Sequence, residues 1–191
     1  MSLLFRIILC AVIITVLGGA AQAQQQPPFA TTKVDGTDNV YVFRYGGAQA
    51  MFVVTKDGVI ATDPIGYGRP QAVTTYLEEI KKVTNQPVRY VIYSHHHFDH
   101  IAGGKPFKDA GATFIAHKKA KERLERLKDP RTVVPDETVD HNRTITLGGT
   151  TLELTYLGLN HSDSTLVMGC RPRKSSLRSI GFRWVHYRRA A

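Results

Sequence analysis

The chain has 191 residues, of which 42% are hydrophobic, and its formal net charge is +9. The charge is uneven, because residues 24–170 carry 17 basic and 16 acidic side chains, whereas residues 171–191 carry seven basic side chains and no acidic one. The near-neutral body gives no sign of a surface specific for nucleic acid, and its length suits one domain with a substantial core.

The first 23 residues are typical of a secretory signal peptide. Arg6 supplies a basic start, residues 7–17 form an apolar run too short to span a bilayer, and residues 21–23 fit a cleavage site. We therefore predict a periplasmic or secreted protein with no stable membrane insertion after cleavage; an uncleaved anchor is the alternative. Cys10 leaves with the signal, so Cys170 is then a lone thiol that cannot form an internal disulfide.

Residues 24–32 are predicted to be a flexible leader, followed by one domain over residues 33–168. In the first half of this domain, β-branched and aromatic residues predict strands at 40–43, 50–54 and 59–62. Apolar residues on one face predict a helix at 71–83, and a further apolar run predicts a strand at 88–93.

The second half of the domain also contains predicted strands and one predicted helix. We predict a strand at 113–116, a charged helix at 117–127, a hairpin of 143–147 with 151–156, and a last strand at 165–168. Strands, then β-α alternation, then strands again indicate an α/β fold with a mixed sheet. From Gly169 onward neither periodicity continues, so residues 169–191 are predicted to be an atypical basic tail.

The functional signal lies directly after the strand predicted at 88–93. Residues 95–100 read His-His-His-Phe-Asp-His, which contains the pattern H-x-H-x-D-H. In an extended segment, the side chains of His95 and His97 point to the same side, so both can bind one divalent ion. Asp99 and His100 can turn toward a second ion. A catalytic zinc commonly has three protein ligands, and His161, in a loop after a predicted strand, is the best candidate for the remaining one.

These motifs together resemble the metallo-β-lactamase superfamily. The matching residues are Ser94 to His100 and the later Gly158-x-x-His161-Ser162-x-Ser164, and the resemblance covers roughly residues 33–168. It implies an αββα sandwich in which His95, His97 and His161 bind one zinc. It further implies that Asp99 and His100 bind a second metal, and that Asp63, after an early strand, supports the metal loop from behind the ligands.

The chain departs from the family pattern after the second motif. The family continues with strands that bring an aspartate bridging the two metals and a further histidine. Here no Asp or Glu follows Asp163, His186 stands among arginines, and Cys170 is too close to His161 to act as the cysteine ligand of some members. We therefore expect an incomplete C-terminal portion, caused by truncation or a frame shift after about Met168. One zinc site is expected, and a second is doubtful.

The resemblance implies an exported zinc-dependent hydrolase of small molecules. Zinc-activated hydroxide would attack a lactam, ester or thioester, with Asp99 as the catalytic carboxylate. The alternative is a catalytically impaired fragment that binds at most one zinc. The sequence does not indicate the oligomeric state, and fold analogy does not identify the substrate.

Overall fold

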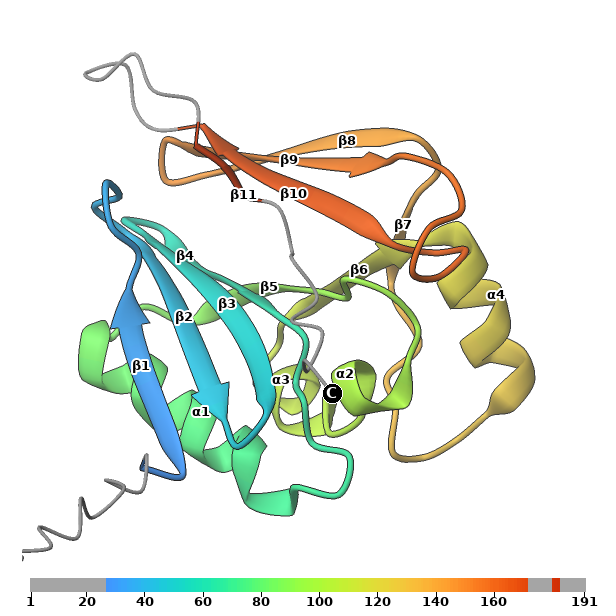
Figure 1. The fold of residues 1–191 in the computed structure, drawn as a ribbon, viewed down its shortest axis with the longest axis horizontal. Coiled ribbons are helices and arrows are strands. Elements are labelled where there is room, and N and C mark those ends of the chain that lie inside the picture. Colours follow the sequence, from blue (N-terminus) through green and yellow to red (C-terminus); the bar gives the residue numbers. More distant parts are fainter. Residues whose placement is uncertain (1–26, 172–179, 183–191) are drawn as a thin grey trace, which may run out of the picture.

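The computed structural model describes residues 27–171 and 180–182 (Figure 1). The predicted signal peptide and most of the predicted basic tail lie outside the described residues. Within the described part of the chain, no helix has the length and apolar character needed to cross a bilayer. The described residues fold into two sheets and four helices, and the histidine motif at 95–100 lies between two consecutive strands of the larger sheet (Figure 1).

The larger sheet has seven strands that lie side by side in chain order. They are β1 (Phe29–Lys33), β2 (Val40–Tyr45), β3 (Ala48–Thr55), β4 (Gly58–Thr62), β5 (Val88–Ile92), β6 (Thr113–His117) and β7 (Glu137–Val139). Strands β1 to β4 pair antiparallel through short turns, whereas β4 to β7 pair parallel. All five residues of β4 are buried, as expected for a central strand that is covered on both faces.

One face of this sheet packs against the helices. These are α1 (Pro70–Val83), α2 (Phe98–Ile101), α3 (Lys105–Asp109) and α4 (Lys118–Leu127). The core between them joins Phe52, Val91 and Phe114 of the sheet to side chains from all four helices. Tyr76 of α1 stacks on Phe43 with ring centroids 4.6 Å apart. The helices therefore hold the ends of the parallel strands in fixed positions.

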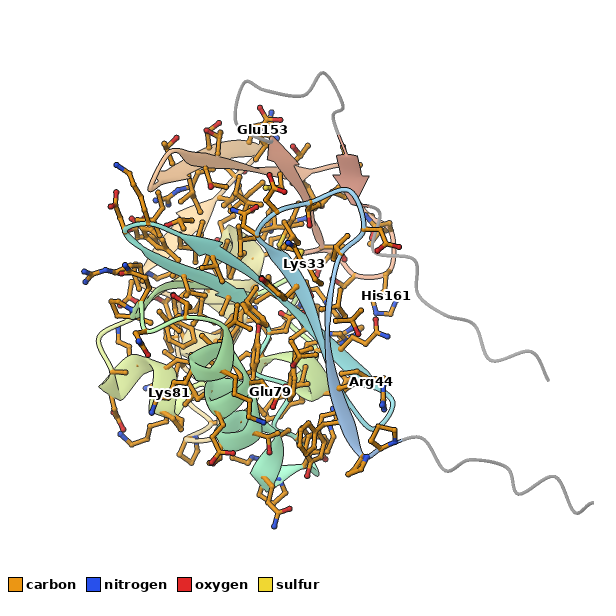
Figure 2. All side chains as sticks on the ribbon, turned by 90° about the vertical axis from the view of Figure 1, so that its left-hand side faces the viewer. Lys33, Arg44, Glu79, Lys81, Glu153 and His161 are labelled. Carbon is orange, nitrogen blue, oxygen red and sulfur yellow. The ribbon has the colours of Figure 1, made fainter. Side chains whose placement is uncertain are left out.

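The other face packs against a second, antiparallel sheet. Its strands are β8 (Asn142–Leu147), β9 (Thr150–Tyr156), β10 (Leu166–Arg171) and β11 (Ile180–Phe182), in the order β11-β10-β9-β8. A second core lies between the sheets and includes Ile60, Ile115, Leu154 and Met168. Figure 2 shows Glu153 on the far side of this sheet. The layers run helices, sheet, sheet, and the described residues place no helix over the outer face of the small sheet.

This architecture confirms the predicted α/β class, and three of the four layers of an αββα sandwich are present in the described residues. The two long helices and the hairpin form where periodicity predicts them, within one residue at each end. Three short elements inside the domain were not predicted: α2, which begins inside the histidine motif, the five-residue α3, and the three-residue β7.

The predicted domain ends differ from the structure at both sides. Residues 29–33, mostly assigned to the flexible leader, form β1, because the backbone of β2 pairs with them and Phe29 stacks on Tyr45 at 6.4 Å. The last predicted strand continues to Arg171, and β11 pairs with it antiparallel from Met168 to Cys170. Main-chain pairing forms these strands although their side chains lack a clear alternation.

Candidate metal centre

The site lies at the edge where the parallel strands β4 and β5 both end. Because parallel strands share a direction, the residues that follow them meet at one edge of the sheet, which is where ligands bind in open α/β folds. Asp63 follows β4, and Ser94 to His97 follow β5. The Asp63 backbone N–H donates to the Ile92 carbonyl at 3.1 Å, so the hydrogen-bonded pairing of β4 with β5 continues one residue past the end of β4.

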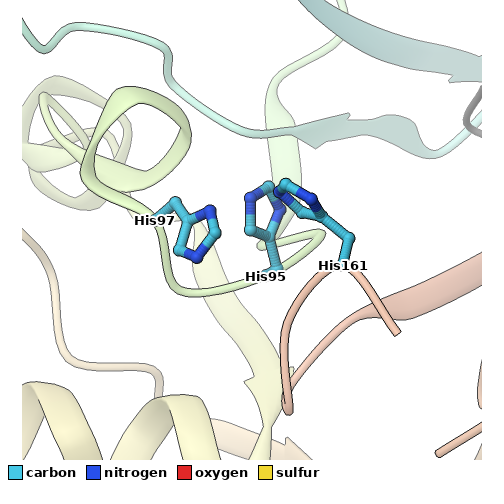
Figure 3. A group of neighbouring side chains, drawn as sticks. All are labelled: His95, His97 and His161. Carbon is cyan, nitrogen blue, oxygen red and sulfur yellow. The ribbon is translucent and has the colours of Figure 1, made fainter. Parts of the chain in front are cut away.

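Three histidines converge at this edge from two loops (Figure 3). His95 and His97 come from the loop after β5, and His161 comes from the loop between β9 and β10. One potential ligand nitrogen of each lies within 4.8 Å of the others. The ring centroids of these three histidines lie 4.5 to 4.9 Å apart. His95 is buried, whereas His161 is exposed, so the cluster opens to solvent on the His161 side.

The two loops are joined by main-chain contacts. The Leu166 N–H, at the start of β10, donates to the Ser94 carbonyl at 2.8 Å. Within the second loop the Asn160 side chain accepts from the His161 N–H at 2.6 Å, and Gly158 adopts a φ of +91°, which favours glycine. These contacts place His161 opposite the first motif, although 64 positions separate the two in sequence.

Asp63 lies directly behind the histidine loop and is fully buried. Its carboxylate accepts from the Ser94 N–H at 2.7 Å, from the Ser94 hydroxyl at 2.5 Å, and from Nδ1 of His100 at 3.0 Å. Burial opposes ionisation, but these hydrogen bonds outweigh it and hold the pKa of Asp63 below its usual value. The supporting role that the resemblance implies for Asp63 is therefore consistent with its contacts.

The hydrogen bonds of the Asp63 carboxylate also determine the tautomers of two histidines, His95 and His100. A carboxylate only accepts, so Ser94 Oγ donates to it, and the Nδ1–H of His95 then donates to Ser94 Oγ at 2.9 Å. His100 donates its own Nδ1–H to Asp63 in the same way. Both rings therefore carry their lone pair on Nε2, the nitrogen that a metal can bind.

Asp99 and His100 lie beside the three-histidine cluster. The His100 ring lies 4.3 Å from that of His95, and its Nε2 lies 3.7 Å from an oxygen of Asp99. The Asp99 side chain is 59% exposed. Among the residues that the structure describes, however, the one compact group of three potential ligands is His95, His97 and His161. Asp99 and His100, the predicted ligands of a second metal, therefore lie next to this group but are not part of it.

The electrostatics of the site act in opposite directions on His95 and His100. Burial and the neighbouring histidines lower the pKa of His95 to about 3, so this ring is unprotonated at neutral pH and can donate its lone pair. For His100, burial is outweighed by Asp63, which raises the pKa of the imidazole. Three imidazoles around an open side form the donor set of a catalytic zinc. The ligand nitrogens of a tetrahedral zinc lie about 3.4 Å apart. Small side-chain rotations would bring the nitrogens of His95, His97 and His161 to this spacing.

Sequence reasoning missed two contributors to the site. Ser94 connects Asp63 to His95, and its position directly before the motif was the available signal. Arg123 of α4, which the sequence placed only in a charged helix, contacts Asp163 and His96. No local signal indicated this contact, because it depends on the second loop, distant in sequence, folding back onto α4.

A metal-ligand cluster at the strand ends of an α/β sandwich defines a class of metal-dependent hydrolases. A family model for the metallo-beta-lactamase superfamily matches residues 44–174. The chain belongs to this superfamily, which confirms the resemblance of its motifs.

Solved structures of metallo-beta-lactamases share this fold. The metallo-beta-lactamase IND-7 matches with a TM-score of 0.61 at 24% identity, over 75% of this chain and 67% of its own. The enzyme from Pontibacter korlensis matches with a TM-score of 0.62 at 23% identity, over 73% and 66%. BJP-1, a subclass B3 enzyme of Bradyrhizobium japonicum, matches with a TM-score of 0.58 at 23% identity, over 75% and 57%. The match therefore spans between 57% and 67% of these three chains.

Proposed function

We propose that this chain is an exported zinc-dependent hydrolase that acts on small molecules with a lactam, ester or thioester bond. The observation that carries the proposal is the convergence of His95, His97 and His161 from two distant loops, with ligand nitrogens within 4.8 Å of one another. Membership of the metallo-beta-lactamase superfamily supports the reaction class. Residues 1–23 would direct export, and the domain would extend from about residue 33 to the end of the small sheet.

The proposed roles follow from the positions of the side chains. His95, His97 and His161 would hold the zinc, and Asp63 would orient His95 through Ser94. A bound zinc would supply Lewis-acid activation of water and polarisation of the scissile carbonyl. Asp99, with its side chain 59% exposed beside His100, would accept the proton of the attacking water or help to hold a second ion.

A second candidate is an impaired fragment that binds at most one zinc and turns over little. One observation favours it. Asp99 and His100 form no compact group with a third potential ligand among the described residues. A second metal would then lack a further ligand among these residues.

Metal stoichiometry measured together with turnover separates these candidates. The purified chain would be loaded with zinc, and its metal content compared with its hydrolysis of a chromogenic lactam and of nitrophenyl esters. Turnover that is abolished by His97→Ala and retained by His141→Ala, an exposed histidine outside the cluster, supports the hydrolase. One zinc per chain or none, without turnover, supports the fragment, and no zinc at all contradicts the hydrolase.

A further inference from the structure

Arg123 of α4 lies at the junction of the two loops that carry the histidines. Its guanidinium forms a fork with Asp163: Nη1 donates to Oδ1 at 2.9 Å and Nη2 to Oδ2 at 3.2 Å. Nη1 also lies within 2.9 Å of both ring nitrogens of His96. Asp163 is two residues from His161, and His96 lies between His95 and His97. One side chain therefore contacts residues within two positions of each of the three clustered histidines.

His96 lies in a bend of the first histidine loop, on the side that faces α4. There its Nδ1 lies 2.7 Å from the hydroxyl of Ser164, which is fully buried in the second loop. The non-ligating histidine of the motif thus contacts the loop of His161 as well as Arg123.

We propose that Arg123 is a positioning residue that fixes the distance between the two histidine loops and so sets the metal affinity of the site. The inference rests on the proposed metal function. The planar fork of arginine matches a carboxylate at two points, which fixes orientation as well as distance, and lysine cannot reproduce this. The contact is partly sheltered, since the side chains of Arg123 and Asp163 are 39% and 33% exposed.

The sign of the effect separates positioning from simple electrostatics. Arg123 is a cation near a site for a divalent cation, so its charge alone opposes metal binding. Removing that charge should raise metal affinity if Arg123 acts only through Coulomb repulsion. If Arg123 instead holds the loops, its removal should lower affinity, by about tenfold, as for other groups that orient ligands without touching the metal.

The test is a titration of the full chain with Co²⁺ in competition with a chromophoric chelator. Arg123→Gln and Arg123→Lys are both expected to bind Co²⁺ about tenfold more weakly than the unmodified chain. Arg126→Gln, which removes an exposed charge from the same helix, is the matched control and should bind as tightly or slightly more tightly. Affinity that is unchanged or higher in Arg123→Gln overturns the proposal.

A double-mutant cycle with Asp163→Asn tests the pair itself. If the fork acts as a unit, the double variant loses no more affinity than the weaker-binding single variant, whereas two independent losses that multiply contradict the proposal. Circular dichroism checks that each variant is folded, and Asp163→Asn and Arg123→Lys remain informative if Arg123→Gln unfolds.

Hydrogen exchange of residues 157–165 in the metal-free protein gives a readout that does not need metal. Faster exchange in Arg123→Gln than in Arg126→Gln supports the positioning role, and equal exchange contradicts it. If the unmodified chain binds no Co²⁺, the proposed metal function fails, while this exchange measurement still decides the role of Arg123.

Discussion

Asp63→Asn should weaken zinc binding as well as the fold, each to a measurable extent. The amide has the shape of the carboxylate, so it can still accept from the Ser94 N–H. Its NH₂ group, however, replaces the oxygen that accepts from the Ser94 hydroxyl and from Nδ1 of His100. An amide nitrogen donates, so the direction of both hydrogen bonds must reverse. Ser94 then donates to Nδ1 of His95, and both imidazoles move their proton to Nε2.

The magnitude follows from the hydrogen bond that metal binding would break. To bind zinc through Nε2, His95 must return its proton to Nδ1 and give up the new hydrogen bond there. A neutral hydrogen bond contributes about 1 kcal/mol net, which corresponds to roughly a fivefold loss of affinity. His100 is not one of the three proposed zinc ligands, so its changed hydrogen bond does not enter this figure.

The effect on folding is limited because two changes oppose each other. Asp63→Asn loses charge-assisted hydrogen bonds to a fully buried acceptor, but it also removes the penalty for burying a charge. We expect the free energy of unfolding of the metal-free protein to fall by about 1–2 kcal/mol.

Competition with a chromophoric zinc chelator at pH 7 measures the affinity, and urea unfolding measures the stability. Asp136→Asn is the matched control, since this carboxylate accepts from the Phe114 N–H at 2.7 Å and lies away from the histidines. It should lose stability while its zinc affinity stays unchanged. Zinc binding by Asp63→Asn that is as tight as that of the unmodified chain refutes the tautomer argument.

Three further outcomes are expected. Gly103→Ala should destabilise the fold by about 1–3 kcal/mol more than Gly111→Ala in urea unfolding; both glycines have a φ of +88°, but only at Gly103 would a Cβ meet a buried valine methyl group, at 2.7 Å. Tyr76→Phe should lower the free energy of unfolding by about 1–2 kcal/mol, because its buried hydroxyl donates to the Met51 carbonyl at 2.7 Å; calorimetry that shows no change contradicts this. Burial and a nearby guanidinium lower the pKa of His96 to about 4, so the unfolded chain takes up this proton first as the pH falls. The stability contributed by neutral His96 is thus present above about pH 6.5 and lost toward pH 4; His96→Asn should flatten that slope in the metal-free protein, and an unchanged slope contradicts the assignment.

The sequence predicted those parts of the fold that depend on local periodicity. The helices α1 and α4 and the β8–β9 hairpin have clear apolar faces, and they form where the pattern indicates. The pattern does not reveal β1 or β11, because main-chain pairing with a neighbouring strand forms these elements. Pairing partners that lie elsewhere in the chain leave little trace in a local window.

The candidate site likewise has a part that the sequence predicted and a part that it could not reveal. Residue types and spacing led to His95, His97 and His161, and the fold brings these three together. The roles of Ser94 and Arg123 depend on contacts between distant segments, so the local sequence could not reveal them. For Asp99 and His100 the motif predicted ligands of a second metal, and that remains a prediction.

The most direct test of the central claim is a count of the histidines that bind one metal ion. In the ¹H NMR spectrum of the Co²⁺-loaded protein, each metal-bound imidazole contributes a strongly shifted, exchangeable N–H signal. With one equivalent of Co²⁺ we expect three such signals, and His161→Ala should remove one of them and weaken binding. Spectra of the unmodified chain and of His161→Ala with the same number of shifted N–H signals would contradict a site built from both loops.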